Sequence, residues 1–169
     1  MAGEASEFGT SHISVVDAAG NAVAMTTTIE DGFGARLMTK GGFLLNNQLT
    51  DFNFSPLDNG KPAANRVEPG KRPRSSMAPT LVFDASGRLE MVVGSPGGSQ
   101  IISYVAKTLV ALIDWRLDPQ VAVDFPNHGS RNGPTEIERG TEAEGWITAL
   151  QTRGHEVRGI DMTSGIQAI

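Results

Sequence analysis

The stretch APTLVFDASGRLEMVVGSPGGSQIISYVAKTLVALIDWRL, residues 78–117, decides the fold class. Two apolar runs, residues 78–83 and 89–93, flank the turn sequence DASG and predict a hairpin of buried strands. The glycine-rich sequence GSPGGS at residues 94–99 ends the second strand. Apolar residues then recur near helical spacing, which predicts a helix over residues 99–117. The stretch therefore predicts paired strands that lead directly into a helix.

Upstream of this stretch, the sequence predicts more strands and a long loop. Residues 12–17 and 22–29 are rich in β-branched residues and surround the turn sequence AAGN, so we expect a hairpin. Residues 43–45 (FLL) predict a short buried strand. Residues 54–74 contain four prolines and predict a long surface loop, a kind of segment that is often functional.

Downstream of the stretch, helices precede strands. Asp118 and Pro119 are typical of the N-cap and first turn of a short helix. Residues 126–139 look irregular, and residues 141–152 predict a second helix. Two strands close the chain, at residues 156–160 and 164–169. The order of strands, helices and strands predicts an α+β layered domain rather than an alternating parallel sheet.

Composition excludes several classes of function. The 169 residues, 39% apolar and 20% charged, suit one globular domain. A net charge of −5 argues against nucleic-acid binding, and no run approaches the ~20 apolar residues of a membrane span. The absence of cysteine excludes disulfides and thiolate catalysis. The three histidines lack metal-ligand spacing, and the sequence implies no cofactor.

Several polar segments have both a structural and a chemical interpretation. The sequence GSPGGS follows a buried strand and opens a helix, so its free N–H groups could bind a phosphate, a carboxylate or an oxyanion, or form a plain turn. Ser75 and Ser76 suit a carboxylate but also a capped turn. Residues 46–48 (NNQ) with Asp51 are typical of turn chemistry. Thr10, at the start of a strand, indicates nothing by itself.

Read together and in order, these segments resemble the small subunit of γ-glutamyltranspeptidases. The matching segments are TSHISVVD at residues 10–17, GNAVA at 20–24, TTT at 26–28, LLNNQLTDF at 44–52, KRPRSSMAPT at 71–80 and GSPGGS at 94–99. The serine-pair and Gly-Ser-Pro-Gly-Gly segments are the most specific to the family. The resemblance covers nearly the whole chain from Thr10 onward.

The resemblance implies a fold, a partner and a maturation step. The fold is the N-terminal-nucleophile hydrolase αββα sandwich, of which this chain is the small-subunit part. The family precursor cuts itself before a threonine that matches Thr10, and the large subunit of the same precursor is the heterodimer partner. Residues 1–9 are then a precursor remnant or an added segment. Residues 10–169 are the small-subunit catalytic domain, truncated at its C-terminus. Periplasmic or secreted placement follows from the family alone.

The resemblance also implies catalytic roles. Thr10 is the nucleophile, and its α-amino group, freed by self-cleavage, is the base; such an amine has a pKa near ~7.7. While residues 1–9 precede it, Thr10 lacks this amine and has no base. Our hypothesis is that the isolated chain is uncut and inactive. Thr28 resembles the threonine that orients the nucleophile. The N–H groups of Gly97 and Gly98 would hold the oxyanion formed from a γ-glutamyl amide such as glutathione.

Five further residues resemble those that bind the glutamyl head of the substrate. Ser75 and Ser76 match the pair that binds its α-carboxylate, and Gln48, Asp51 and Glu30 match the group that holds its α-ammonium. Some family members carry asparagine at the position of Glu30 and aspartate at the position of Thr50. The stretch between Asp51 and Ser75 is shorter than in members with a lid, so we expect a more open pocket.

Two alternative functions remain open from the sequence. The first is a related acylase that cleaves cephalosporin or glutaryl side chains, or a poly-γ-glutamate hydrolase or transferase. The second is a non-catalytic binding subunit with the same fold. The serine pair and Asp51 favour a substrate with a free α-carboxylate and α-ammonium, and the presence of both nucleophile and oxyanion segment favours an enzyme.

Overall fold

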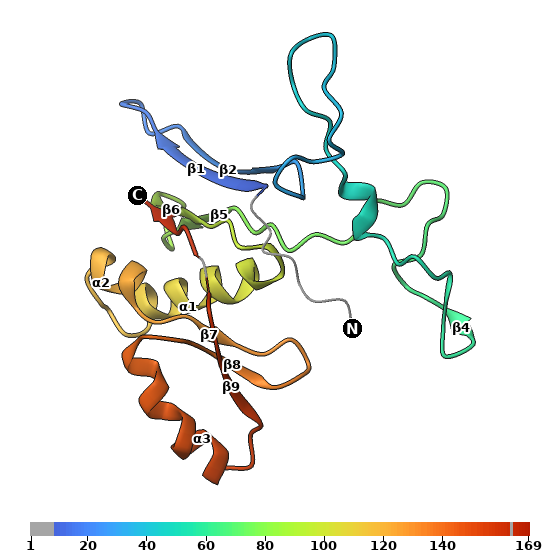
Figure 1. Cartoon of the computed structure of the whole chain (residues 1–169). Helices are drawn as coiled ribbons and strands as arrows, with labels where there is room; N and C mark the ends of the chain where they lie inside the picture. Colours follow the sequence, from blue (N-terminus) through green and yellow to red (C-terminus); the bar gives the residue numbers. More distant parts are fainter. Residues whose placement is uncertain (1–8, 163) are drawn as a thin grey trace. The chain divides into compact units, whose positions relative to one another are not determined.

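The computed structural model describes residues 9–162 and 164–169, which form two compact units. Of the described residues, the first unit contains 9–10 and 27–76, and the second contains 11–26, 77–162 and 164–169. The described elements mix helices and strands (Figure 1). The α+β class expected from the sequence is confirmed.

The predicted N-terminal hairpin is present as β1 (Thr10–Val16) and β2 (Ala22–Thr28). The N–H of Asp17 donates to the carbonyl of Asn21 at 2.9 Å, and the N–H of Ile29 donates to the carbonyl of Gly9 at 3.0 Å. Both bonds belong to one antiparallel register. In that register Thr10 is opposite Thr28, in a pair whose side chains approach closely.

The two faces of this hairpin differ in character. One face carries Thr10, the buried His12 and Thr28. The opposite face is apolar, and within the second unit its side chains are 42–52% exposed: they are Ile13, Val15, Val23 and Met25. Among the described residues, this apolar face is exposed to solvent.

In the second unit, a helix and the hairpin cover opposite faces of one sheet. This sheet has the order β10 (Gln167–Ala168), β6 (Leu89–Gly94), β5 (Thr80–Phe83), with antiparallel neighbours. Val93 of β6 packs against Ile101 and Val105 of α1 (Ile101–Ile113) and forms the core. Because neighbouring strand residues face opposite ways, Gly94 faces away from α1.

The β1–β2 hairpin packs on that other face. A Cβ at Gly94 would lie 2.1 Å from Cε1 of His12, so the imidazole occupies the space that a side chain at residue 94 would need. The hydroxyl oxygen of Ser14 lies 3.5 Å from the carbonyl oxygen of Gln167. The layer order in this unit is therefore helix, sheet, hairpin (Figure 1).

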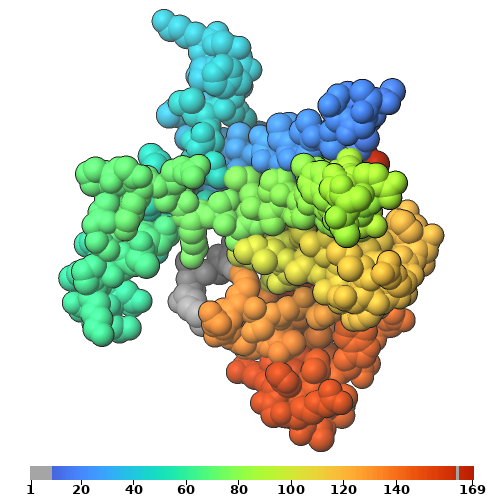
Figure 2. Space-filling model, turned by 180° about the vertical axis from the view of Figure 1, so that it is seen from behind, coloured from blue at the N-terminus to red at the C-terminus, as the bar shows by residue number. Residues whose placement is uncertain are grey.

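The C-terminal part of the same unit forms a second small sheet. β7 (His128–Gly129) pairs antiparallel with β8 (Thr135–Glu138), and β8 pairs parallel with β9 (Val157–Ile160). The expectation that residues 126–139 are irregular is wrong, because β7 and β8 lie within them. Figure 2 shows this orange region against the yellow α1.

The remaining helices largely follow the sequence-based predictions. Asp118 caps α2 (Pro119–Asp124) by accepting a hydrogen bond from the N–H of Gln120 at 2.9 Å. The predicted helix over residues 141–152 consists of the 3₁₀ helix η3 (Glu142–Trp146) and α3 (Ile147–Thr152). Another 3₁₀ turn, η2 (Gly98–Gln100), leads into α1.

The first unit consists mostly of turns and loops. Its elements are η1 (Gln48–Asp51) and the two short strands β3 (Leu57–Asp58) and β4 (Lys61–Pro62), which pair with each other. The predicted buried strand at residues 43–45 is wrong: Phe43 is 61% exposed, and this stretch makes one isolated bridge, between Met38 and Leu44. The long loop predicted over residues 54–74 is confirmed apart from β3 and β4. No described helix is long and apolar enough to cross a membrane.

A buried lysine links two helices of the second unit. Lys107 of α1 is 6% exposed, and its ammonium donates to the carbonyls of Ala122, Val123 and Phe125 at 3.2, 3.4 and 2.7 Å. These carbonyls lie at the C-terminal end of α2, where the helix leaves acceptors unsatisfied. Burial lowers the pKa of Lys107 to about 8, against the opposing charges of Glu138 and Asp124.

We expect Lys107→Met to lower the free energy of unfolding by about 1–3 kcal/mol, because it leaves buried carbonyls without a donor. Denaturant unfolding at neutral pH measures this change. Lys40→Met removes an exposed lysine and is the matched control, expected to change stability little. Equal stability of the two variants would contradict the capping role.

Candidate active site

Thr10 and Thr28 form the centre of the candidate site in the first unit. The hydroxyl of Thr10 donates a hydrogen bond to Oγ1 of Thr28 at 2.9 Å. The same oxygen of Thr28 accepts the N–H of Glu30 at 2.9 Å. Both threonine side chains are partly buried. The hairpin register thus places the predicted orienting residue in contact with the predicted nucleophile.

The chain turns sharply just after β2. Glu30 has a positive φ of 74°, which is uncommon for a residue with a side chain. Asn47 holds this turn from two sides: its Oδ1 accepts the N–H of Asp31 at 3.0 Å, and its own N–H donates to the carbonyl of Ile29 at 3.2 Å. Asn47 therefore has the structural role that the NNQ segment suggested, and it brings η1 to the end of β2.

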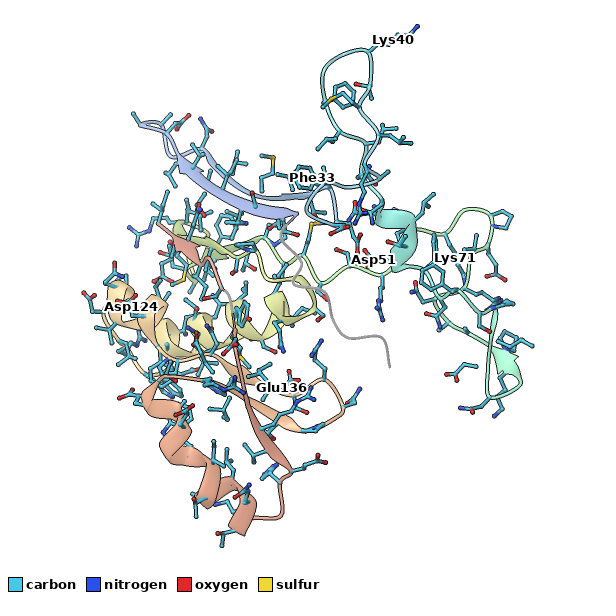
Figure 3. The ribbon with its side chains drawn as sticks, viewed as in Figure 1. Phe33, Lys40, Asp51, Lys71, Asp124 and Glu136 are labelled. Atoms are coloured by element: carbon cyan, nitrogen blue, oxygen red, sulfur yellow. The ribbon has the colours of Figure 1, made fainter. Side chains whose placement is uncertain are left out.

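Gln48 and Asp51 lie on the single 3₁₀ turn η1. Asp51 is labelled in Figure 3. Both side chains are partly exposed. Burial raises the pKa of the Asp51 carboxyl, against the opposing charge of Arg74. A partly buried carboxylate is stabilised more by a nearby cation than a carboxylate in open solvent is. The ion pair offsets the free-energy cost of removing water from the charged group.

Asn65 connects Asp51 to the serine-pair segment, and the sequence analysis missed it. Its amide Nδ2 donates to the carbonyl of Asp51 at 2.6 Å, and its Oδ1 accepts the N–H of Arg74 at 3.0 Å. The carbonyl of Asn65 also accepts the N–H of Asn53 at 2.9 Å. One side chain therefore fixes the backbone at both candidate halves of the substrate-head site, Asp51 and residues 74–76.

The bonds from Asn65 to Asp51 and Arg74 form what we call the Asn65 clamp, and Ser75 and Ser76 come directly after Arg74. Ser75 is exposed and Ser76 is half-buried. Because the backbone immediately before them is held at Arg74, their position relative to Asp51 is set by Asn65. Hydroxyls can bind a carboxylate and a carboxylate can bind an ammonium, so this set of side chains suits a group that carries both charges.

Gly97 and Gly98 lie in the second unit, at the turn that opens η2 and α1. Both have positive φ, 134° and 55°, a conformation that side chains rarely tolerate. The turn is anchored at Ser95, whose hydroxyl donates to the carbonyl of Pro96 at 2.6 Å and accepts the N–H of Gly165 at 3.2 Å. The first N–H groups of a helix have no partner within it, so this turn suits an anion.

A buried carboxylate supports the same turn from within the second unit. Glu136 of β8 is nearly fully buried (labelled in Figure 3). It accepts hydrogen bonds from Gln100 at the start of α1, from Arg158 and from Arg131, which also donates to Ser99. Burial acts to raise the pKa of Glu136, but the bonds from Arg158 and Gln100 and the charge of Arg131 outweigh it and lower this pKa.

His12 is buried two residues after Thr10. Its Nδ1 lies 2.7 Å from the hydroxyl of Thr26, and its Nε2 lies 3.2 Å from that of Ser14. These bonds orient the imidazole within the hairpin, and its contact on Gly94 places β1 against the sheet of the second unit. Burial lowers the pKa of His12 below its ordinary value of 6.5. We therefore assign His12 the role of an anchor. The described residues contain no group of side chains that could hold a metal ion.

Comparison with protein families decides the identity of the chain. The gamma-glutamyltranspeptidase family model matches residues 2–169. The chain belongs to the gamma-glutamyltranspeptidase family. A glutathione hydrolase proenzyme of Pseudomonas sp. (strain A14) is 39% identical over 170 residues, covering 95% of this chain and 29% of that protein. An acylase ACY 1 proenzyme of Pseudomonas sp. (strain V22) is 38% identical over 95% of this chain and 28% of its own length.

Solved structures of the gamma-glutamyltranspeptidase family share the fold. The Helicobacter pylori gamma-glutamyltranspeptidase T380A mutant matches with a TM-score of 0.83 and 34% identity, covering 94% of this chain and 89% of that chain. The N-terminal-nucleophile hydrolase fold expected from the sequence is confirmed. The chain spans less than a third of the curated relatives' length, as the small-subunit part of a gamma-glutamyltranspeptidase would.

The lowered pKa of His12 predicts a pH dependence of stability. Because the unfolded chain binds this proton more tightly than the folded one, the free energy of unfolding falls as pH drops below about 6.5. Thermal midpoints measured between about pH 7.5 and 5.5 should fall less in His12→Gln than in the wild type. His155→Gln, at an exposed position, should keep the wild-type slope. The same slope in all three proteins would show that His12 is not the titrating anchor.

Proposed function

We propose that this chain is the catalytic small-subunit part of an enzyme that cleaves γ-glutamyl amides such as glutathione through a Thr10 acyl-enzyme. The observation that carries the proposal is the hydrogen bond from the Thr10 hydroxyl to Thr28, the two residues to which the sequence resemblance assigns the roles of nucleophile and orienting residue. A threonine hydroxyl needs activation and orientation to attack a carbonyl. The bond to Thr28 supplies orientation.

The proposed reaction has two steps. After cleavage before Thr10, its free α-amine accepts the hydroxyl proton, and Oγ1 attacks the γ-carbonyl of the substrate. The N–H groups of Gly97 and Gly98 stabilise the oxyanion, and the leaving amine takes the proton. Water or the amine of an amino acid or peptide then releases the glutamyl group from Thr10. The first acceptor gives hydrolysis and the second gives transfer.

The first unit supplies the groups proposed to bind the glutamyl head. Asp51, with Gln48 and Glu30, binds the α-ammonium, and Ser75 with Ser76 binds the α-carboxylate. The clamp at Asn65 supports this assignment, because it holds the two halves at a fixed separation. A substrate that lacks either charge loses half of these contacts.

The layer order of the second unit supports a large-subunit partner. An αββα sandwich has helices on both outer faces, and here helix α1 covers one face while the hairpin's apolar face, formed by Ile13, Val15, Val23 and Met25, is exposed. An exposed apolar face of this kind marks an interaction site. We propose that helices of the large subunit cover it and complete the fourth layer.

Co-production with the large subunit of the same precursor tests this function. We expect N-terminal sequencing to find a chain beginning at Thr10. The matured pair should cleave a γ-glutamyl anilide at least ~10-fold more efficiently than a glutaryl anilide, which lacks the α-ammonium. The isolated chain should remain uncut and inactive.

Each alternative predicts a different result. The similarity to an acylase proenzyme favours a second candidate function, that of an acylase. A preference for the glutaryl anilide over the γ-glutamyl anilide would support the acylase function. A correctly cut pair that turns over neither anilide would support a non-catalytic binding subunit.

A variant of Asn65 tests the substrate-head clamp. Asn65→Ala should raise KM for the γ-glutamyl anilide by about 10-fold and change kcat less. The substitution weakens substrate binding but leaves the contacts of Thr10 in place. Asn65→Asp keeps the acceptor for Arg74 but loses the donor to Asp51, so its KM should lie in between. The control is Asn59→Gly, at an exposed position with a φ of 49° that glycine accepts. Equal KM values for all four proteins would contradict the clamp.

A further inference from the structure

The peptide bond between Gly9 and Thr10 is held by the ladder of the β1–β2 hairpin. The carbonyl of Gly9 accepts the N–H of Ile29 at 3.0 Å, within the range of a good hydrogen bond. On the other side of the same bond, the hydroxyl of Thr10 is held by Thr28. The carbonyl that self-cleavage would attack and the hydroxyl that would attack it are therefore both fixed by β2 and the residue that follows it.

No side chain fits at residue 9. A Cβ there would lie 2.4 Å from the carbonyl oxygen of Glu30 and 2.7 Å from that of Asp31, and real Cβ atoms do not approach so closely. Both obstacles are backbone atoms, so neither can move aside by a rotamer change. The positive φ of Glu30 and the two bonds made by Asn47 fix them in place.

We propose that the N–H of Ile29 is the oxyanion donor for self-cleavage, and that Gly9 is the positioning residue that lets the scissile carbonyl reach it. This proposal rests on the proposed function, because it assigns the groups that carry out the maturation step. It separates maturation from turnover. The Ile29 N–H serves the Gly9 carbonyl once, whereas the Gly97 and Gly98 N–H groups are proposed to serve every substrate.

The maturation step balances without a cofactor. Oγ1 of Thr10 attacks the carbonyl carbon of Gly9, and the resulting oxyanion is the oxygen that already accepts the Ile29 N–H. The C–N bond between Gly9 and Thr10 breaks, and the hydroxyl proton passes in net terms to the departing nitrogen. This leaves an ester between Gly9 and Thr10. Water hydrolyses the ester to a Gly9 carboxylate and a free Thr10 hydroxyl, with the α-amine released.

A side chain at residue 9 should slow this step. Gly9→Ala in the full precursor should lower the rate of self-cleavage by at least ~10-fold, because the carbonyl must move away from the Ile29 N–H. Mass spectrometry of the precursor over time measures the appearance of the chain that begins at Thr10. Gly133→Ala is the matched control, since a Cβ there meets no atom within 4 Å. It should mature at the wild-type rate.

Two further readouts separate catalysis from general damage. Residue 9 is not part of the matured small chain, so Gly9→Ala enzyme that has matured should have wild-type kcat/KM. Hydroxylamine cleaves esters, so it should not rescue the variant if ester formation is the slowed step. Rescue by hydroxylamine, or maturation at the wild-type rate, would overturn the proposal.

Removing the Ile29 N–H alone tests the donor without a steric change. Incorporation of the α-hydroxy analogue of isoleucine at residue 29 replaces that N–H by an oxygen and leaves the side chain in place. We expect self-cleavage to slow on the order of 100-fold. Unchanged cleavage in this variant would refute the donor role whatever the outcome for Gly9→Ala. A wild-type precursor that never cuts before Thr10 would instead refute the proposed function.

Discussion

The register of the β1–β2 hairpin is the constraint on which the candidate site depends. Side chains alternate between the two faces of a strand, so a slip of one residue would move Thr10 and His12 to the opposite face. In the observed register the hydroxyl of Thr10 reaches Thr28, while His12 reaches Thr26 and rests on Gly94. The same pairing brings the N–H of Ile29 to the carbonyl of Gly9. One ladder therefore fixes the proposed nucleophile, its proposed orienting residue and the peptide bond before Thr10.

The proposed substrate-head site depends on local hydrogen bonds rather than on a hydrophobic core. Residues 27–76 contain little regular structure, and their fixed points are polar: Asn47 at the turn after β2, and Asn65 between Asp51 and Arg74. Amide side chains suit this task because each donates and accepts at once. A loop region built in this way can hold partly exposed charged groups at defined positions without a hydrophobic core.

The sequence predicted most elements whose signals are local. The hairpin at β1 and β2 and the Asp118 cap of α2 follow from turn and capping residues within a few positions. The strands β7 and β8 were missed because they are short, the loop between them contains Asn132 and Gly133, and the pairing of β8 with β9 is long-range. The buried strand predicted at residues 43–45 is absent. Leu44 makes only an isolated bridge to Met38, and the side chain of Phe43 is exposed.

The candidate site shows the same difference between local sequence signals and long-range contacts. The family resemblance pointed to Thr10 and Thr28, and the structure brings their hydroxyls together. Asn65 and Gly9 gave no signal in the sequence, because their importance lies in contacts with residues 9 to 22 positions away that only the folded chain defines. Turn residues such as Asn and Gly are common, so their type alone does not reveal such contacts.

The most direct measurement of the central claim is the location of the acyl group on the matured two-chain enzyme. The enzyme is mixed with a γ-glutamyl anilide, quenched in acid within one turnover and digested for peptide mass mapping. We expect one added glutamyl group, on the peptide that begins at Thr10. An acyl group on any other residue would refute the role of Thr10 as the nucleophile. So would rapid turnover in a Thr10→Ala enzyme, matured by separate production of its two chains.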